Sequence, residues 1–204
     1  FGYEMGPFET WDAIGLKVGL DAVKEAGLKY ADWLDEMIAK GAESFYRIHE
    51  GKRQFWDRAA NEYKNIPGQE GRVNLSVAKS RGVVWQNTGT TITDLGDGIL
   101  NVEFHTKMNT IGGDVLAGLI KAIDLAEEQY EGLVVYNEGG NFSAGANVGL
   151  IFMMAAEQEL DELDFAIRQF QQTMMRMRYS SIPVVAAPHN LTLGGGCELC
   201  LHAD

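Results

Sequence analysis

Residues 192–199 read Thr-Leu-Gly-Gly-Gly-Cys-Glu-Leu, so three glycines lead directly into the carboxylate of Glu198. The run follows an apolar, β-prone stretch at 182–187 and precedes residues that favour a helix. Glycine permits a tight turn and close approach to the backbone, and the first turn of a helix leaves N–H donors unpaired. The run therefore predicts a backbone site for an oxyanion beside Glu198. The alternative is a strand-to-helix turn that needs glycine only for packing.

A second glycine-containing run lies at 139–148 and again follows an apolar stretch, 133–136, that is typical of a strand. Two turns of this kind, each at the end of a strand, can present two N–H groups to one carbonyl oxygen. Such a pair of donors stabilises an enolate or a tetrahedral oxyanion. The two runs together indicate acyl chemistry more strongly than either does alone.

At these residues the chain resembles the crotonase family, which includes the enoyl-CoA hydratases and isomerases. The run Phe-Ser-Ala-Gly-Ala-Asn-Val at 142–148 looks like the family's first oxyanion loop, and Leu-Gly-Gly-Gly-Cys-Glu-Leu at 193–199 looks like its second. The resemblance implies that the backbone N–H groups of Ala146 and Gly195 bind the oxygen of a CoA thioester substrate. It also implies that Glu198 is the first of two catalytic glutamates that act on water.

The resemblance further implies contacts with CoA from Ser143, Ala144 and Val148 in the first loop. Lys107 follows the strand candidate at 100–104, where relatives often place a lysine that faces CoA. An exposed, solvated lysine is an equal alternative. Two departures leave the finer substrate class open. Asn147 stands where the family often has Asp, and residues 189–190 read His-Asn where the family often has Asn-Gly.

The family's second glutamate would lie beyond Asp204, so the resemblance covers the first half of a crotonase domain. The chain also begins at Phe1 without Met. We therefore expect a piece of a longer protein, which need not be active by itself.

Residues 1–28 resemble a helical repeat in the C-terminal domain of 3-hydroxyacyl-CoA dehydrogenases. Pro7 suits a helix start, because the N–H that it lacks would be unpaired there. The family's domain helps with dimerisation, which implies a homo-oligomer. The chain contains no Gly-x-Gly-x-x-Gly motif, so we expect it to bind no cofactor itself and expect NAD in a dehydrogenase domain outside it.

The predicted fold is mixed, α+β and α/β, with an all-α helical module followed by a partial crotonase-like ββα spiral domain. Turn signals at Pro67 and Gly68 end the first helical pattern. We expect a helical module at 1–62, a linker or arm at 63–87 and the crotonase half at 88–204. Residues 158–179 predict a long helix with one apolar face, used for packing or, given its methionines, as an adaptable binding surface.

Composition narrows the partners and the location. The net charge of −12 argues against nucleic acid and anionic membranes as partners. The longest apolar run, at 148–156, is too short to span a bilayer, and no signal peptide is visible.

Cys197 and Cys200 form a Cys-x-x-Cys pair without a thioredoxin-like context or a second ligand pair, so we expect reduced packing residues rather than a redox or zinc site. The four histidines lack metal-ligand spacing, so no metal is expected, and a cytoplasmic location fits.

Together, the two resemblances imply a bifunctional fatty-acid β-oxidation enzyme, with the dehydrogenase part first and the enoyl-CoA hydratase part second. The alternatives are an acyl-CoA isomerase or thioesterase of the same family, since one fold supports several chemistries. A further alternative, from another class, is a non-catalytic module that joins two catalytic halves and drives oligomerisation.

Overall fold

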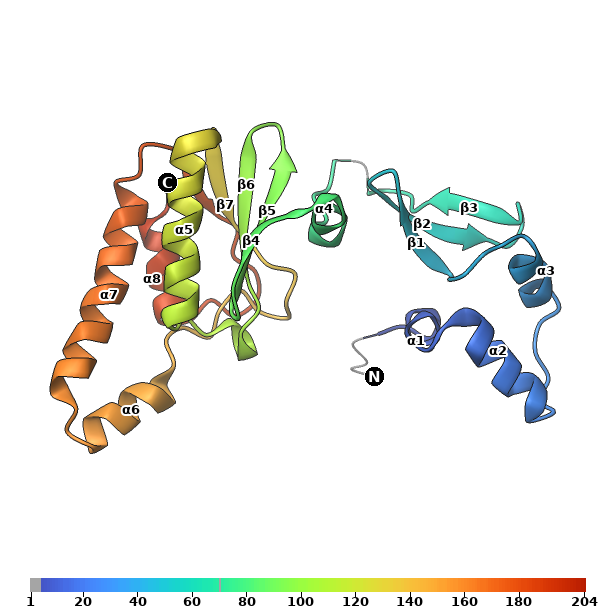
Figure 1. Cartoon of the computed structure of the whole chain (residues 1–204), viewed down its shortest axis with the longest axis horizontal. Helices are drawn as coiled ribbons and strands as arrows, with labels where there is room; N and C mark the ends of the chain where they lie inside the picture. The colour runs from blue at the N-terminus through green and yellow to red at the C-terminus, as the bar shows by residue number, and fades with distance from the viewer. Residues whose placement is uncertain (1–4, 70) are drawn as a thin grey trace. The chain divides into compact units, whose positions relative to one another are not determined.

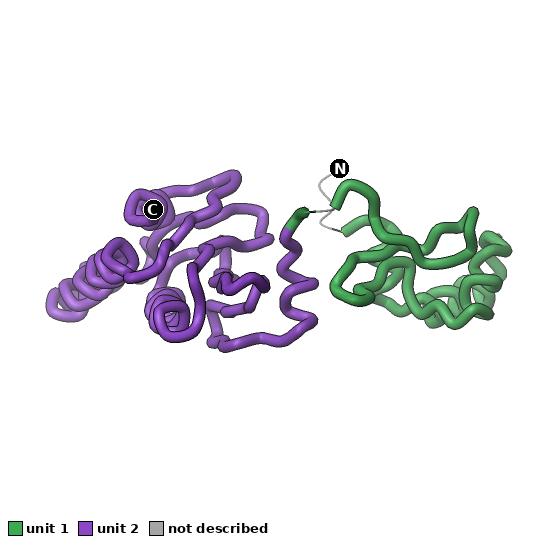
Figure 2. Tube along the Cα trace, turned by 90° about the horizontal axis from the view of Figure 1, so that it is seen from above, with its two compact units in different colours: residues 1–72 green, residues 73–204 purple. Residues whose placement is uncertain are grey.

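The computed structural model describes residues 5–69 and 71–204. Its elements fall into two compact units, Phe1–Arg72 and Val73–Asp204, which are coloured separately in Figure 2. Each unit has its own hydrophobic core, and Figure 1 gives the element labels. In the described part of the chain, no helix is both long enough and apolar enough to cross a membrane.

The first unit combines three helices with a small antiparallel sheet in the order β1-β2-β3. Its core contains Leu20, Met37 and Phe45, and two carboxylate oxygens of Asp12 accept the backbone N–H groups of Phe45 and Tyr46 at 2.7 and 2.9 Å. The elements are α1 (Pro7–Ile14), α2 (Leu16–Glu25), α3 (Trp33–Ala39), β1 (Tyr46–His49), β2 (Lys52–Asp57) and β3 (Glu62–Asn65).

The prediction of an all-α module over 1–62 is wrong after residue 45, where the three strands lie. Phe45 and Ile48 are three residues apart, a spacing that fits a helix, but Glu50 and Gly51 have φ values of 50° and 71°. Two successive positive φ values form the tight hairpin turn that pairs right-twisted strands. His49 accordingly pairs with Lys52 across a two-residue loop.

The second unit contains a five-stranded sheet in the order β4-β5-β6-β7-β8, with helices packed against it. Strands β4, β5 and β6 pair antiparallel, whereas β6, β7 and β8 pair parallel. The elements are α4 (Leu75–Arg81), β4 (Val83–Gln86), β5 (Thr90–Gly96), β6 (Ile99–Phe104), the short 3-10 helix η1 (Lys107–Asn109), α5 (Gly113–Gln129), β7 (Gly132–Val135), α6 (Val148–Ala156), α7 (Leu160–Arg178), β8 (Val184–Ala186) and α8 (Gly195–His202).

The linker expected at 63–87 is instead divided between the two units. Strand β3 extends to Asn65 in the first unit, and α4 and β4 belong to the second. The Asn74 side chain accepts the Val77 N–H at 3.1 Å and caps α4, whose Leu75 is fully buried. Because β4 also pairs with β5, residues 74–86 are part of the folded unit rather than an arm.

The parallel pairing of β7 with β8 positions the candidate site. Val135 and Ala186 are partners at the ends of these two strands. Parallel neighbours end at the same edge of a sheet, so the loops that follow them emerge together. Figure 1 shows α5, α7 and α8 beside this part of the sheet. The Arg176 guanidinium ties α7 to α5 by bonding Glu127 at 2.9 Å and Asp124 at 3.0 Å.

Candidate active site

The two glycine-containing runs lie directly against each other. The Phe142 N–H donates to the carbonyl of His189 at 3.0 Å, and the Ser143 N–H donates to that of Leu191 at 3.1 Å. In return, the Leu193 N–H donates to the carbonyl of Ser143 at 2.9 Å. The loops after β7 and β8 therefore run in parallel and are joined by backbone hydrogen bonds.

A third segment, after β6, holds the first loop from its other side. The Ile111 N–H donates to the carbonyl of Gly145 at 2.8 Å. The Ser143 hydroxyl donates to the carbonyl of Asn109 at 2.7 Å and accepts the Gly145 N–H at 3.0 Å. Ser143 is fully buried, so this side chain holds the loop in place and offers no surface to CoA in this conformation.

The two predicted oxyanion donors lie side by side. Gly194, at the N-terminal end of α8, has a φ of 48°, a left-handed conformation that favours glycine. A β-carbon built on Gly195 would lie 3.5 Å from the backbone nitrogen of Ala146. Among the hydrogen bonds of the described residues, neither Ala146 nor Gly195 donates its N–H to a protein acceptor. Both residues line one cavity, so two backbone donors are available to a ligand there.

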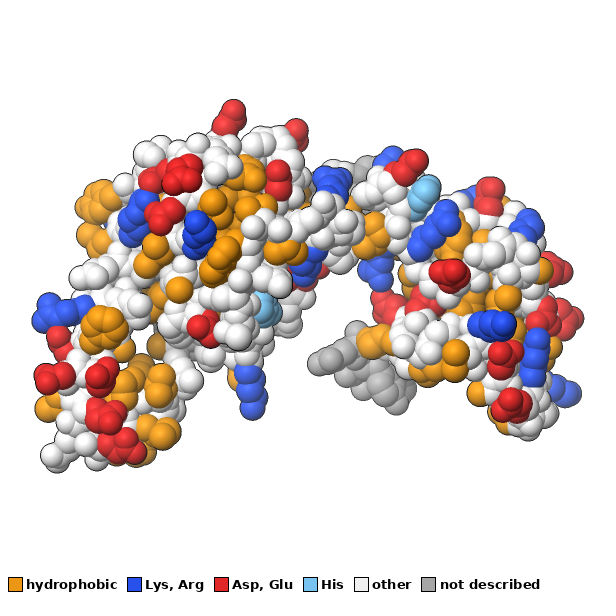
Figure 3. All heavy atoms as spheres, viewed as in Figure 1, with side chains coloured by type: hydrophobic (Ala, Val, Ile, Leu, Met, Phe, Trp, Pro, Cys, Tyr) orange, Lys and Arg blue, Asp and Glu red, His pale blue; other side chains and the backbone are white. Residues whose placement is uncertain are grey.

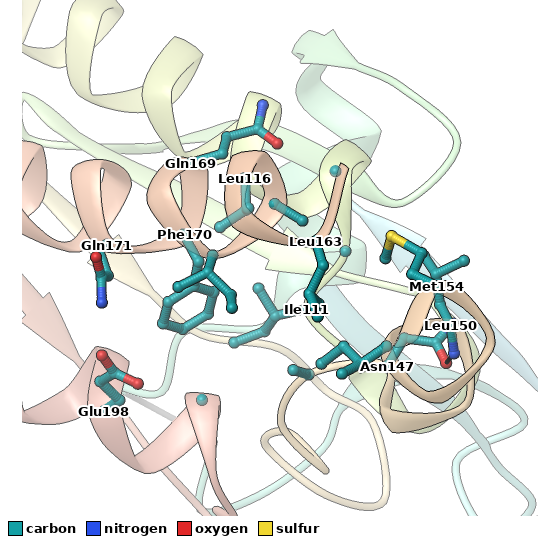
Figure 4. A pocket seen from close by; sticks show the side chains of 17 residues that line it. Ile111, Leu116, Asn147, Leu150, Met154, Leu163, Gln169, Phe170, Gln171 and Glu198 are labelled. Carbon is teal, nitrogen blue, oxygen red and sulfur yellow. Dashed lines mark hydrogen bonds between the residues drawn. The ribbon is translucent and has the colours of Figure 1, made fainter. Parts of the chain in front are cut away.

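The carboxylate of Glu198 lies at the same cavity. Glu198 belongs to the first turn of α8 and has an exposed side chain. Figure 4 shows this carboxylate facing the amide of Gln171 from α7. Sequence reasoning did not single out Gln171, because a glutamine on the polar side of an amphipathic helix carries no signal of its own.

The cavity beside these groups has a volume of about 290 Å³ and a mainly aliphatic lining. A wall of this kind suits the apolar part of a ligand, with a few polar groups fixing its orientation. Asn147 begins α6 by accepting the Leu150 N–H at 3.2 Å, a capping role that Asp would fill equally well. The apolar side chains of the lining come from α5, α6, α7 and the segment before α5: Ile111, Leu116, Leu150, Ile151, Met154, Leu163, Ala166, Ile167 and Phe170.

The remaining predicted CoA contacts do not line this cavity. Ala144 is half-buried in the first loop, and its N–H donates to the carbonyl of Met108 at 3.1 Å. Val148 is 71% exposed at the start of α6. Lys107 is exposed in η1, one residue from the Met108 carbonyl that binds the loop. Ala144 and Lys107 thus lie where the first loop contacts η1, away from the cavity lining.

The exposed end of the α6–α7 region carries both apolar and acidic side chains, as Figure 3 shows. Helix α6 has no buried residue, and Phe152 is 71% exposed. Acidic residues follow within and after the turn to α7: Glu157, Glu159, Asp161, Glu162 and Asp164. On the α6 side, the wall of the cavity is therefore formed by side chains that are not buried in the hydrophobic core.

The cysteines and His189 are not among the residues that line the cavity. Cys197 is exposed and Cys200 half-buried, and both are free thiols. Burial raises the pKa of the Cys200 thiol, which makes it a weaker nucleophile. The His189 Nε2 lies 2.8 Å from the carbonyl of Gly139, which belongs to the other loop, so this side chain links the two loops. No group of three or more potential metal ligands occurs among the described residues.

The family model of enoyl-CoA hydratase/isomerase matches residues 94–204. Over its whole length the chain is 44% identical to a Bacillus subtilis protein named "Probable 3-hydroxyacyl-CoA dehydrogenase", of which it spans 26%. It is 30% identical over 125 residues to a fatty acid oxidation complex subunit alpha of Psychrobacter cryohalolentis, covering 58% of this chain and 17% of that protein.

The fold of the second unit also occurs in solved structures. A crystal structure of an enoyl-CoA hydratase/isomerase from Xanthobacter autotrophicus aligns with a TM-score of 0.52 and 22% identity, covering 58% of this chain and 45% of that chain. This likeness shows the fold, and the family match includes both glycine runs. The chain therefore belongs to the enoyl-CoA hydratase/isomerase, or crotonase, family.

Proposed function

We propose that the complete protein hydrates trans-2-enoyl-CoA to 3-hydroxyacyl-CoA and oxidises this product with NAD in a separate domain. The observation that carries the proposal is the pair of adjacent N–H donors of Ala146 and Gly195 at the cavity that also holds Glu198. The relative named as a 3-hydroxyacyl-CoA dehydrogenase supports the second activity. This chain contains no Gly-x-Gly-x-x-Gly motif, so none of its residues is assigned to NAD.

The oxyanion donors act on the thioester. Its carbonyl oxygen accepts both N–H groups, and these bonds strengthen as water adds at C3 and negative charge develops on that oxygen. One such donor is typically worth roughly 3 kcal/mol in the transition state. Because the loops are joined by backbone hydrogen bonds, the donors are in place before the reaction begins.

Glu198 acts on water at the edge of the same cavity. Its carboxylate positions the water and accepts one proton from it as the hydroxyl oxygen bonds to C3, and the equivalent of this proton is returned to C2, so that the elements of water add across the double bond. The family resemblance assigns a share of this work to a second glutamate farther along the complete protein. The 204-residue chain by itself is therefore proposed to be inactive.

The remaining parts of the substrate follow from the lining. The acyl chain occupies the aliphatic cavity between α5, α6 and α7. The CoA moiety is proposed to contact Lys107, Ala144 and Val148 along the first loop, where Lys107 supplies local positive charge in a chain of net charge −12. We also propose that the complete protein is a homo-oligomer in the cytoplasm. Light scattering of the complete protein would measure its oligomeric state.

The direct test is crotonyl-CoA hydration, followed by loss of the absorbance of the enoyl thioester. The complete protein and the 204-residue chain are assayed side by side. Activity in the complete protein alone is the expected result. Absence of hydration in both would reject the hydratase assignment and favour isomerisation or thioester hydrolysis at the same oxyanion site.

Hydrogen exchange separates an enzyme from a non-catalytic module that only joins domains. A non-hydrolysable acyl-CoA analogue is added to the complete protein, and amide exchange is followed along the chain. We expect slower exchange at 142–148 and 194–198, because the analogue's oxygen would occupy the two donors. Unchanged exchange in both segments, at an analogue concentration that saturates the proposed dehydrogenase domain, would support the non-catalytic module.

A further inference from the structure

The aromatic ring of Phe170 lies against the second oxyanion loop. A β-carbon built on Gly195 would lie 3.0 Å from Phe170 Cζ and 3.1 Å from Cε2. These distances are shorter than ordinary van der Waals contact, so the ring edge borders the backbone of the proposed donor. Phe170 therefore lies beside the reacting end of the substrate, although it comes from the middle of α7.

The ring divides the lining of the cavity into two kinds of surface. Figure 4 shows Phe170 between Glu198 on one side and the aliphatic side chains of Ile111 and Leu163 on the other. Glu198 and Gln171 supply the polar side, and the aliphatic side continues to Leu150 and Met154. The ring edge therefore borders the path of an acyl chain that starts at the Gly195 donor.

The helix holds the ring in a defined position. Phe170 is half-buried and packs against the core, and Met174 and Met177, one and two turns later, are almost fully buried. The Arg176 guanidinium fixes the same end of α7 to α5. By contrast, Ile167, one turn before Phe170, is 47% exposed. The ring therefore belongs to the anchored part of α7, at its border with the exposed part.

We infer that Phe170 is a specificity-determining residue that limits which acyl chains reach the aliphatic side of the cavity. The inference rests on the proposed acyl-CoA function of the same site. With the ring in place, a short enoyl group fits between the oxyanion donors, Glu198 and the ring face. A longer chain has to bend around the ring edge, and a smaller residue at position 170 opens a direct path toward Leu163.

The test uses the complete protein with the variants Phe170→Ala and Phe170→Leu. Phe165→Ala serves as the matched control, because Phe165 is on the same helix and 63% exposed. Calorimetry gives the Kd values of butyryl-CoA and decanoyl-CoA, which are saturated and do not react by hydration. We expect Phe170→Ala to shift the ratio of the two Kd values at least about tenfold toward decanoyl-CoA, the lower end of what a methylene-sized change in a hydrophobic pocket achieves. Phe170→Leu should give a smaller shift in the same direction and Phe165→Ala none.

The outcomes separate this inference from the proposed function. An unchanged ratio in both Phe170 variants, with binding retained, would overturn the inference alone. If circular dichroism shows that Phe170→Ala does not fold, the ratio of the two Kd values for Phe170→Leu decides whether the inference holds. A wild-type protein that binds both thioesters but hydrates no enoyl-CoA would overturn the proposed hydration, and the Kd ratios would still decide the role of Phe170. If the wild-type protein binds neither thioester, both the proposed function and the role of Phe170 are overturned.

Discussion

Gly145 and Gly195 approach so closely that a β-carbon on Gly145 would lie 3.0 Å from the backbone nitrogen of Gly195. The same β-carbon would lie 2.7 Å from the carbonyl oxygen of Leu193, and Gly145 has a φ of 89°. Both the conformation and the contact require glycine here. The distance between the two oxyanion loops is therefore set by a position that has no side chain.

Replacing Gly145 by alanine should separate the two loops. The added methyl meets backbone atoms that cannot rotate away, and the positive φ adds strain of about 1–3 kcal/mol. We expect a lower free energy of unfolding and a large loss of crotonyl-CoA hydration in the complete protein, measured by urea unfolding and the absorbance assay. The control is Gly140→Ala, because a β-carbon on Gly140 meets no atom within 4 Å. Equal effects of the two substitutions would contradict the proposed spacing.

Two substitutions at Gly195 isolate the contribution of its N–H group. Proline removes the donor yet suits the first position of a helix, whereas alanine keeps the donor. Both add the same β-carbon against Phe170. We expect kcat of Gly195→Pro to fall about 10²–10³-fold below that of Gly195→Ala, the usual effect of losing one oxyanion donor. Similar kcat values for the two variants would show that this N–H does not bind the thioester oxygen.

The carboxylate of Glu198 should matter for chemistry more than for binding. In Glu198→Gln the amide keeps the shape of the side chain but cannot accept the proton from water. Loss of general base catalysis typically costs about 10²–10⁴-fold in rate. We expect such a loss in kcat for crotonyl-CoA hydration, with the Kd of butyryl-CoA within about threefold of wild type, well below the tenfold change that 1.4 kcal/mol would give. Turnover near the wild-type rate would remove Glu198 from the mechanism.

The contact between α5 and α7 should depend on pH through Glu127. Hydrogen bonds from the Arg176 guanidinium and the Ser181 N–H lower the pKa of Glu127 from 4.5 to about 2. A carboxyl group with a lowered pKa in the folded state stabilises the fold above its unfolded pKa, and this stabilisation is lost as the pH falls from about 4.5 toward about 2.

Glu127→Gln should therefore remove stability at neutral pH, on the order of 1–2 kcal/mol after allowance for solvent screening. It should also flatten the fall in stability below about pH 4.5, near the unfolded pKa. Urea unfolding at a series of pH values checks both effects. Glu128→Gln is the control, since Glu128 is exposed on the same helix turn and forms no ion pair within the described part of the chain. An identical pH profile for the two variants would contradict the role of Glu127.

The sequence predicted the two glycine-containing turns because their signal is local. Gly145, Gly194 and Gly195 lie in the loops that follow apolar strand segments, and a glycine-rich turn there has few alternatives. Strands β7 and β8 and the long helix α7 were also predicted, the strands from their apolar runs and the helix from its single apolar face. The family match over 94–204 confirms the resemblance that these runs carried.

What the sequence did not reveal depends on contacts between distant segments. The spacing of Phe45 and Ile48 fits a helix, and the positive φ of Glu50 that decides for a hairpin has no strong sequence signal. Similarly, the sequence left open whether the apolar stripe on α7 serves for packing or as a binding surface. In the structure one part of the stripe packs in the core and another part lines the cavity. Met174 and Met177 are buried in the core, whereas Leu163 and Ile167 line the cavity.

Helix α6 contributes side chains to the cavity but buries none in the core. Substitutions at exposed positions usually change stability by less than about 0.5 kcal/mol. Leu150 and Ile151 can therefore be exchanged with little penalty to folding, while the donors of Ala146 and Gly195 remain fixed by the scaffold. Under the proposed function, this division would allow the range of accepted acyl chains to change without loss of the two backbone donors.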